Sequence, residues 1–261
     1  MREPNALQSW EAAGHALSSS WPGLVGELVL ALLLVAAAAL LVRAFLRRRR
    51  YRASGALGEE DLRAIHAALV AAERRTVGEI LPVVLERSDP YPEAHWLATL
   101  TTPLIGAVGL ALWLPREEPA LLLSCLLGLG ALGYAGARFL PDVQRFFLRE
   151  SRARKVVEEQ AFQEFHRYEL HRTQARTGVL LFVSLLERRA VVLADSGIDA
   201  RVEPEQWTRT IELVLDGIRR GSLRAGLESG IHSAGEVLAR HFPVEAGDRN
   251  ELPDRVIVRR E

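Results

Sequence analysis

The chain has 261 residues, of which 49% are hydrophobic and 25% are charged, and its formal net charge is zero. This balance provides no global field that would attract nucleic acid, so no nucleic-acid partner is expected. The single cysteine, Cys125, excludes an internal disulfide and a thiolate-clustered zinc site.

The first apolar run follows a short N-terminal tail, residues 1–23. Residues 24–42 contain one charge, Glu27, and we expect a transmembrane helix over 24–46. A helix needs roughly 20 apolar residues to cross the hydrocarbon core. The basic cluster follows the run instead of preceding it, which argues against a cleavable signal peptide. The alternative is a buried helix of a soluble protein.

Residues 59–93 are expected to form the first part of a soluble domain. Residues 59–75 predict a helix, because acidic residues occupy the first turn and arginines the last turn, as the helix dipole favours. Ile80 to Leu85 then predict a short strand. Pro82 within it suggests an edge strand or an irregularity, because proline lacks a backbone donor.

Two further apolar runs, residues 96–114 and 120–137, carry no charged residue and are separated only by residues 115–119. Two apolar helices joined by such a short turn form a hairpin, and we expect a transmembrane hairpin over 96–137. Aromatic residues near the ends of the runs fit the membrane interface. Buried core helices of a soluble protein are again the alternative.

Both flanks of this hairpin lie on one side of the membrane, and both are rich in arginine. The run Arg47–Arg50 joins the same compartment if the first helix also spans, whereas residues 1–23 carry one formal cation. The positive-inside rule then places residues 47–95 and 138–261 in the cytoplasm. We therefore expect three crossings, with the lipid bilayer as a partner.

Residues 150–242 are expected to form the second part of the soluble domain. Residues 150–173 predict a long helix, and the apolar segment Val179–Leu185 predicts a buried strand. A turn over 186–189 leads to a second strand, Ala190–Ala194, so the two form a hairpin. Helices are expected from Pro204 to Gly221 and over 223–241, and residues 243–261 are expected to be a polar tail.

One pattern occurs twice in the chain. Residues 75–86 and 176–187 both read as Arg-Thr, a glycine, an apolar strand and a closing glutamate. The glycines, Gly78 and Gly178, are expected to end a helix in the left-handed conformation. The two strands are then expected to lie side by side in one sheet, with the membrane hairpin inserted into a single domain.

Residues 76–89 and 171–198, with the paired helices that follow, resemble the TPM domain family, and the similarity extends over 59–93 and 150–242. The resemblance is to a bacterial branch in which a hydrophobic hairpin interrupts the domain. It implies a small α/β/α sandwich with a mixed sheet, here joined to transmembrane helices. It also implies a bacterial cytoplasmic (inner) membrane protein. Family members are described as acid phosphatases, as assembly or repair factors, or as metal-binding.

Carboxylates follow the strand Ala190–Ala194 and are the candidate metal ligands. Asp195 and Asp199 could hold a hard cation such as Ca²⁺ or Mg²⁺, although their spacing is not that of an EF-hand loop. The alternative is a turn in which Gly197 has a positive φ. The family's turn matches Asp195 and Gly197, so an inherited site would include Asp195.

The turn between the paired strands is a candidate anion contact. Arg188 and Arg189 could grip phosphate beside Glu187, and the alternative is a solvated turn. Glu79 could approach the same end of the sheet, and its alternative role is a solvated strand start. Known nucleotide, nucleophile-elbow and zinc-protease motifs are absent from the sequence.

Two functions from different classes remain open. The first is a non-catalytic membrane accessory protein that binds a protein partner and supports membrane-complex maintenance, with no catalytic residue and no cofactor. The second is a metal-dependent phosphatase built on Asp195 and Asp199, with Glu187 and Arg188 as further contributors. Analogy of fold does not carry function, so the first is preferred.

Overall fold

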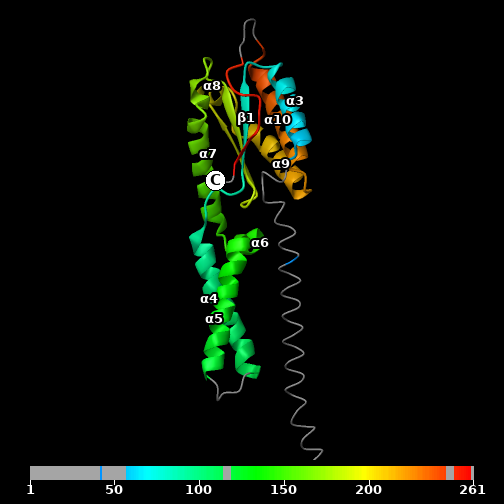
Figure 1. Ribbon diagram of the computed structural model, residues 1–261. Helices are drawn as coiled ribbons and strands as arrows, with labels where there is room; N and C mark the ends of the chain where they lie inside the picture. Colours follow the sequence, from blue (N-terminus) through cyan, green and yellow to red (C-terminus); the bar gives the residue numbers. More distant parts are fainter. Residues whose placement is uncertain (1–41, 43–56, 114–118, 245–249, 260–261) are drawn as a thin grey trace, which may run out of the picture.

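The computed structural model describes residues 42, 57–113, 119–244 and 250–259. Two parts are distinct: a sandwich of helices and strands, and a pair of long helices that projects from it (Figure 1). The helix expected over 24–46 lies outside the described residues, apart from residue 42.

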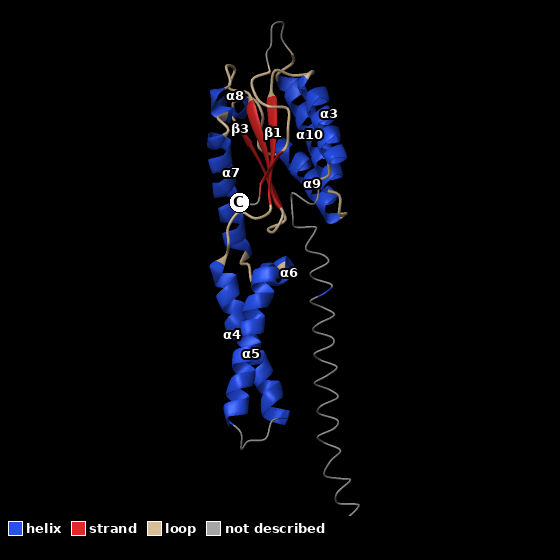
Figure 2. Cartoon of the chain, viewed as in Figure 1, coloured by secondary structure: helices blue, strands red, loops and turns tan. Residues whose placement is uncertain are grey.

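A four-stranded mixed sheet forms the centre of the sandwich (Figure 2). β1 runs parallel to both β2 and β4, and β2 pairs with β3 in antiparallel fashion, so the strand order is β3-β2-β1-β4. The strands are β1 (Glu79–Leu85), β2 (Gly178–Ser184), β3 (Arg189–Ala194) and β4 (Ile257–Arg259). The two strands of the repeated pattern are therefore neighbours, as expected.

Helices cover both faces of this sheet, which confirms the α/β/α sandwich. One face carries α3 (Glu59–Glu73), α9 (Gln206–Arg219) and α10 (Leu223–His241). The other face carries α7 (Glu150–Arg167) and a short 3₁₀ helix, Leu170–Arg172. Both α3 and α7 are shorter than their sequence patterns predict.

The two layers explain why β1 is apolar after Glu79 and why β2 is apolar up to Ser184. In β2, Val179 and Leu181 face α3, α9 and α10, whereas Leu180 and Phe182 face α7. Successive side chains of a strand point to opposite faces, so burial on both faces requires apolar residues throughout.

Pro82 lies in a central strand, so the expected edge position is wrong. The N–H of Ile80 points away from β2 and donates to the Glu73 carboxylate at 3.1 Å. The nitrogen of Pro82, two residues later, faces the same side, where β4 begins to pair only at Val83. The sheet therefore needs no backbone N–H donor at position 82, and proline can occupy it.

Residues 243–261 contain more than the expected tail, because Ile257–Arg259 form β4. The Arg259 guanidinium donates to both oxygens of Glu164, at 2.9 and 3.2 Å, and this carboxylate on α7 is fully buried. The C-terminal strand is thus tied to the helix layer as well as to β1.

Neither Gly78 nor Gly178 has the expected left-handed conformation. Among the described glycines, Gly221 alone has a positive φ, of +88°, and it follows α9 as the sequence predicts. Gly178 is needed for space instead, because an added Cβ would lie 2.5 Å from the carbonyl oxygen of Leu170. At Gly78 the equivalent atom would lie 3.0 Å from the Leu238 side chain.

The projecting pair consists of α4 (Pro92–Trp113) and α5 (Pro119–Phe139), which pack side by side. A short helix, α6 (Pro141–Phe146), then turns the chain towards α7. The pair interrupts the sandwich between β1 and α7, so the two parts of the domain share one sheet, as the sequence predicts.

Candidate functional site

The predicted site residues lie at opposite ends of the sheet. Asp195 and Glu79 lie where β1 and β2 begin and β3 ends, which we call the Asp195 end. Glu187 and Arg188 lie in the turn at the other end, which we call the Glu187 end. Seven residues of β2 separate the ends by roughly 20 Å. A single site that combines Asp195 with Glu187 is excluded, and Glu79 does not approach the arginine turn.

Asp195 is buried at the start of α8 (Ser196–Asp199), with 6% of its surface exposed. Its Oδ1 accepts a hydrogen bond from the backbone N–H of Ser196 at 2.6 Å. Its Oδ2 is also buried and has no hydrogen-bond partner among the described residues. One oxygen therefore has a capping role, and the other is a buried acceptor without a protein donor among the described residues.

Asp199 lies one helical turn after Asp195. Burial raises the pKa of the Asp199 carboxyl, and the nearby Asp195 charge raises it further. A bound cation would favour the charged form of the Asp199 carboxyl. No group of three or more potential metal ligands forms within the described ranges, so any cation here would rely on this pair and on water.

Gly197 is in α8 and does not have the expected positive φ. The carbonyl oxygens of Arg176 and Ala175 would lie 2.6 and 2.8 Å from an added Cβ. Arg176 itself has the left-handed conformation, with a φ of 53°. The requirement for glycine thus comes from close packing against the loop before β2.

A second group of carboxylates at the Asp195 end was not foreseen from the sequence. Glu79 accepts hydrogen bonds from the backbone N–H groups of Glu251 at 3.0 Å and Leu252 at 3.4 Å. Burial raises the pKa of Glu73 to about 8, and the charges of Asp254 and Glu79 add to this effect. These acids hold the segment before β4 over the start of β1. No local sequence signal links residues so far apart.

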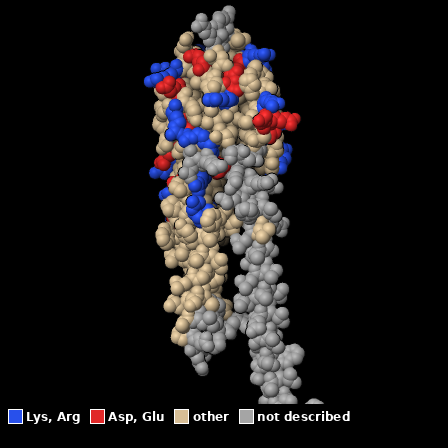
Figure 3. Space-filling model, viewed as in Figure 1, with Lys and Arg blue, Asp and Glu red and all other residues tan. Residues whose placement is uncertain are grey.

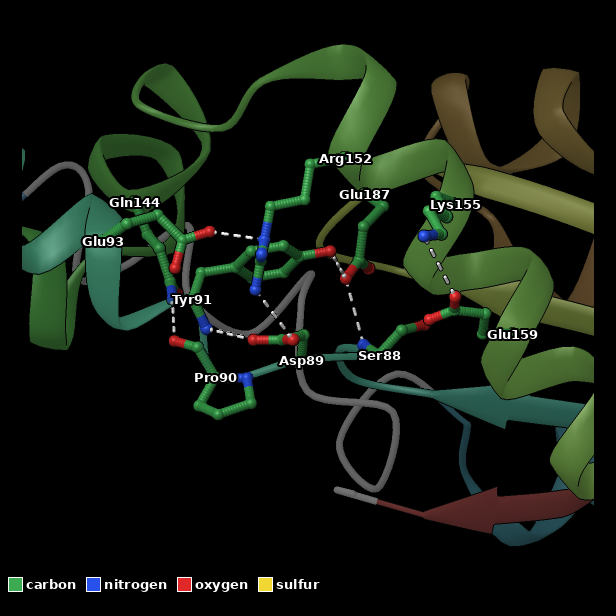
Figure 4. A network of polar contacts seen from close by, with 10 residues as sticks. All are labelled: Ser88, Asp89, Pro90, Tyr91, Glu93, Gln144, Arg152, Lys155, Glu159 and Glu187. Carbon is green, nitrogen blue, oxygen red and sulfur yellow. Dashed lines mark hydrogen bonds and ion pairs between the residues drawn. The ribbon is translucent and has the colours of Figure 1, made fainter.

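At the Glu187 end, a buried carboxylate links the sandwich to the helical pair (Figure 4). Glu187 is 6% exposed and accepts hydrogen bonds from the N–H of Ser88 at 3.0 Å and the hydroxyl of Tyr91 at 2.8 Å. The Ser184 hydroxyl also donates to it. Burial, together with the Glu187 charge, raises the pKa of Tyr91, so the phenol stays protonated as the donor.

Further contacts tie α4, α6 and α7 to the same place. Arg152 on α7 pairs with Glu93 at 2.6 Å and with Asp89 at 3.3 Å. Gln144 on α6 donates to the carbonyl of Pro90 at 2.8 Å. We call the group of Ser88, Asp89, Tyr91, Glu93, Gln144, Arg152 and Glu187 the joint. Its hydrogen bonds and ion pairs connect the loop after β1, the β2–β3 turn and three helices, so the sandwich and the helical pair are tied together here.

The two candidate anion contacts at this end are already paired with acids. Arg188 lies 3.5 Å from Asp142, and Arg189 lies 3.0 Å from Glu150. Arg188 has the left-handed conformation of a tight turn, with a φ of 53°. The two arginines therefore connect the β2–β3 turn to acidic residues of α6 and α7.

Residues 145–237 match the model of the TPM domain family. This segment runs from the end of α6 through β2, β3 and α9 into α10, and it contains both Asp195 and Glu187. This segment is therefore similar to a TPM domain, and the match covers less than half of the chain. The match begins after the helical pair, so α3 and β1 are joined to the TPM domain by the shared sheet, not by the family match itself.

No curated protein matches the chain. Among solved structures, the chain is similar to the BA42 protein of the psychrophilic bacterium Bizionia argentinensis, at 21% identity. The similarity covers 77% of this chain and 94% of that chain, with a TM-score of 0.47.

Proposed function

We propose that this chain is a membrane-anchored TPM-domain protein whose sandwich is a non-catalytic interaction module. The observation that carries the proposal is the joint, which connects the TPM domain to a pair of apolar helices through several hydrogen bonds and ion pairs. An anchor tied to the domain by several contacts suits a module that must present one face to a partner complex. The partner is proposed to be a protein of a membrane complex.

The surface of the helical pair supports a membrane role. Leu104 and Ile105 on α4 are 71% and 76% exposed, and Leu127 on α5 is 67% exposed. Within the described residues, one helix is long and apolar enough to cross a membrane, with its best window at Leu122–Phe139 and a mean hydropathy of 1.4. Apolar side chains around a projecting pair are stable when lipid surrounds them.

The arginine-rich segments that flank the apolar helices support a membrane topology for the chain. We propose that the TPM domain faces the cytoplasm of a bacterium and that the chain crosses the inner membrane three times, with the first crossing at 24–46. Reporter fusions at residue 261 and within residues 115–119 should then fall on opposite sides of the membrane. Fusions on the same side would contradict the hairpin.

A non-catalytic role is supported by the structural contacts that Glu187 and Glu79 already make. Glu187 accepts three hydrogen bonds inside the joint, and Glu79 holds the segment before β4. The full-length protein in detergent should therefore not hydrolyse a generic phosphomonoester. Turnover that disappears in Asp195→Asn but persists in Glu203→Gln, an exposed neighbour, would contradict this role.

One observation favours the alternative, a cation-dependent phosphatase at the Asp195 end. The Oδ2 atom of Asp195 is buried without a partner among the described residues, beside Asp199, whose pKa is raised. If Ca²⁺ or Mg²⁺ binds there, millimolar cation should raise the Tm of the wild type by several degrees. Asp195→Asn should abolish the shift and Glu203→Gln should retain it. An unchanged wild-type Tm would remove this alternative.

A further inference from the structure

Exposed aromatic side chains gather where the helical pair meets the sandwich. Trp96 on α4 and Tyr134 on α5 are 63% and 43% exposed, and their rings lie 6.4 Å apart. Phe139 at the end of α5 and Phe146 on α6 are 54% and 83% exposed. Tryptophan and tyrosine favour the boundary between hydrocarbon and head groups.

The length of the helical pair agrees with a head-group boundary at the level of Trp96 and Tyr134. The helical residues 96–113 rise by about 27 Å at 1.5 Å per residue. The hydrocarbon core of a bilayer is about 30 Å thick. If the turn between α4 and α5 reaches the far head groups, Trp96 and Tyr134 lie at the near head groups.

Cationic side chains lie at the same level (Figure 3). Residues 138–155 contain six arginines and lysines against two acids. Arg138 and Arg149 are exposed, and neither has an ion pair with any residue that the structure describes. The Arg138 guanidinium instead lies 5.9 Å from the centre of the Phe139 ring. Such cations are available to lipid phosphate.

We propose that these residues form an interfacial collar that binds anionic phospholipid head groups. The collar consists of Trp96, Tyr134, Arg138, Phe146 and Arg149. In this arrangement α6 lies in the head-group layer, and its Gln144 connects this layer to the rest of the joint. Because the joint ties the sandwich to α4 and α6, the collar fixes the orientation of the TPM domain on the bilayer surface. The inference rests on the proposed membrane anchoring of α4 and α5.

Single probes on the full-length protein in vesicles test the collar and the anchor separately. Cys125, the single cysteine, lies within α5 and reports insertion when labelled with a fluorophore. A second probe is placed at position 146 by Phe146→Cys in a Cys125→Ser background. Spin labels near the head group and deep in the acyl chain then quench each probe according to its depth.

We expect the deep label to quench the probe on Cys125, and the shallow label to quench the probe at position 146. A quenched Cys125 probe with a fully aqueous probe at 146 would overturn the collar and leave the anchor intact. If neither probe is quenched, both proposals fail.

Lipid charge is tested with head-group spin-labelled phosphatidylglycerol and phosphatidylcholine. Each exposed cation should give about a fivefold preference for the anionic lipid, equivalent to about 1 kcal/mol. Arg138→Gln with Arg149→Gln should remove most of this preference at the 146 probe. The matched double variant Arg63→Gln with Arg219→Gln, whose cations lie on α3 and α9, should keep it. Equal preference in both double variants would refute a role for the collar arginines.

Discussion

Glu73 makes the stability of the sandwich depend on pH. Burial raises the pKa of this carboxyl from 4.5 to about 8, and Asp254 and Glu79 add to the effect. Between these pH values the folded state binds more protons than the unfolded state, so the free energy of unfolding falls as pH rises. The stability that protonated Glu73 provides is complete below pH 4.5 and is lost as pH rises to about 8.

The size of the effect follows from linkage. One pKa unit corresponds to about 1.4 kcal/mol, so the buried carboxyl lowers the free energy of unfolding by about 4 kcal/mol between pH 4 and pH 8. Glu73→Gln keeps an oxygen that can accept from the Ile80 N–H but cannot ionise. At pH 8 the variant should be more stable than the wild type, by roughly 10 °C in Tm.

Thermal melting of the full-length chain in a neutral detergent, followed by circular dichroism from pH 5 to pH 9, measures this difference. Glu60→Gln, an exposed position on the same helix, is the matched control and should follow the wild type. A Glu73→Gln variant whose Tm falls with pH as steeply as that of the wild type would refute the assignment.

Other substitutions test the packing of the sheet. Gly178→Ala should cost about 1–3 kcal/mol, because the new methyl would lie 2.5 Å from the Leu170 carbonyl oxygen, and an unchanged urea midpoint would contradict this. Arg259→Ala should cost about 2 kcal/mol, because the buried Glu164 carboxylate loses the guanidinium nitrogen that donates to both of its oxygens and β4 loses its link to α7. Arg167→Ala, which removes a more exposed partner of the same carboxylate, should cost less, and equal costs would argue against a special role for β4.

Local sequence patterns predicted the strands and helices whose apolar residues recur at regular, short spacings. Uninterrupted apolar residues identified β1 and β2, and helical periodicity placed α10 at Leu223–His241. The repeated Arg-Thr-Gly pattern also predicted that β1 and β2 are neighbours, which their parallel register confirms. These features depend on residues a few positions apart, so they can be read from the chain directly.

Other features depend on contacts between residues far apart in the chain. The segment Ile257–Arg259 is a strand because it meets the open edge of β1 and because Arg259 reaches Glu164. Glu187 looked like part of a solvated turn, yet it is buried because Tyr91, which lies 96 residues earlier, donates to it.

The sequence by itself determined the apolar segments, the helices and the paired strands, because local periodicity and composition encode them. Only the tertiary structure decided which carboxylates share an end of the sheet. It separated Asp195 from Glu187 and placed Glu73 beside Asp254. The physical reason is that the charge state and hydrogen bonding of a buried acid depend on its neighbours in space, and folding brings these neighbours together from distant parts of the chain.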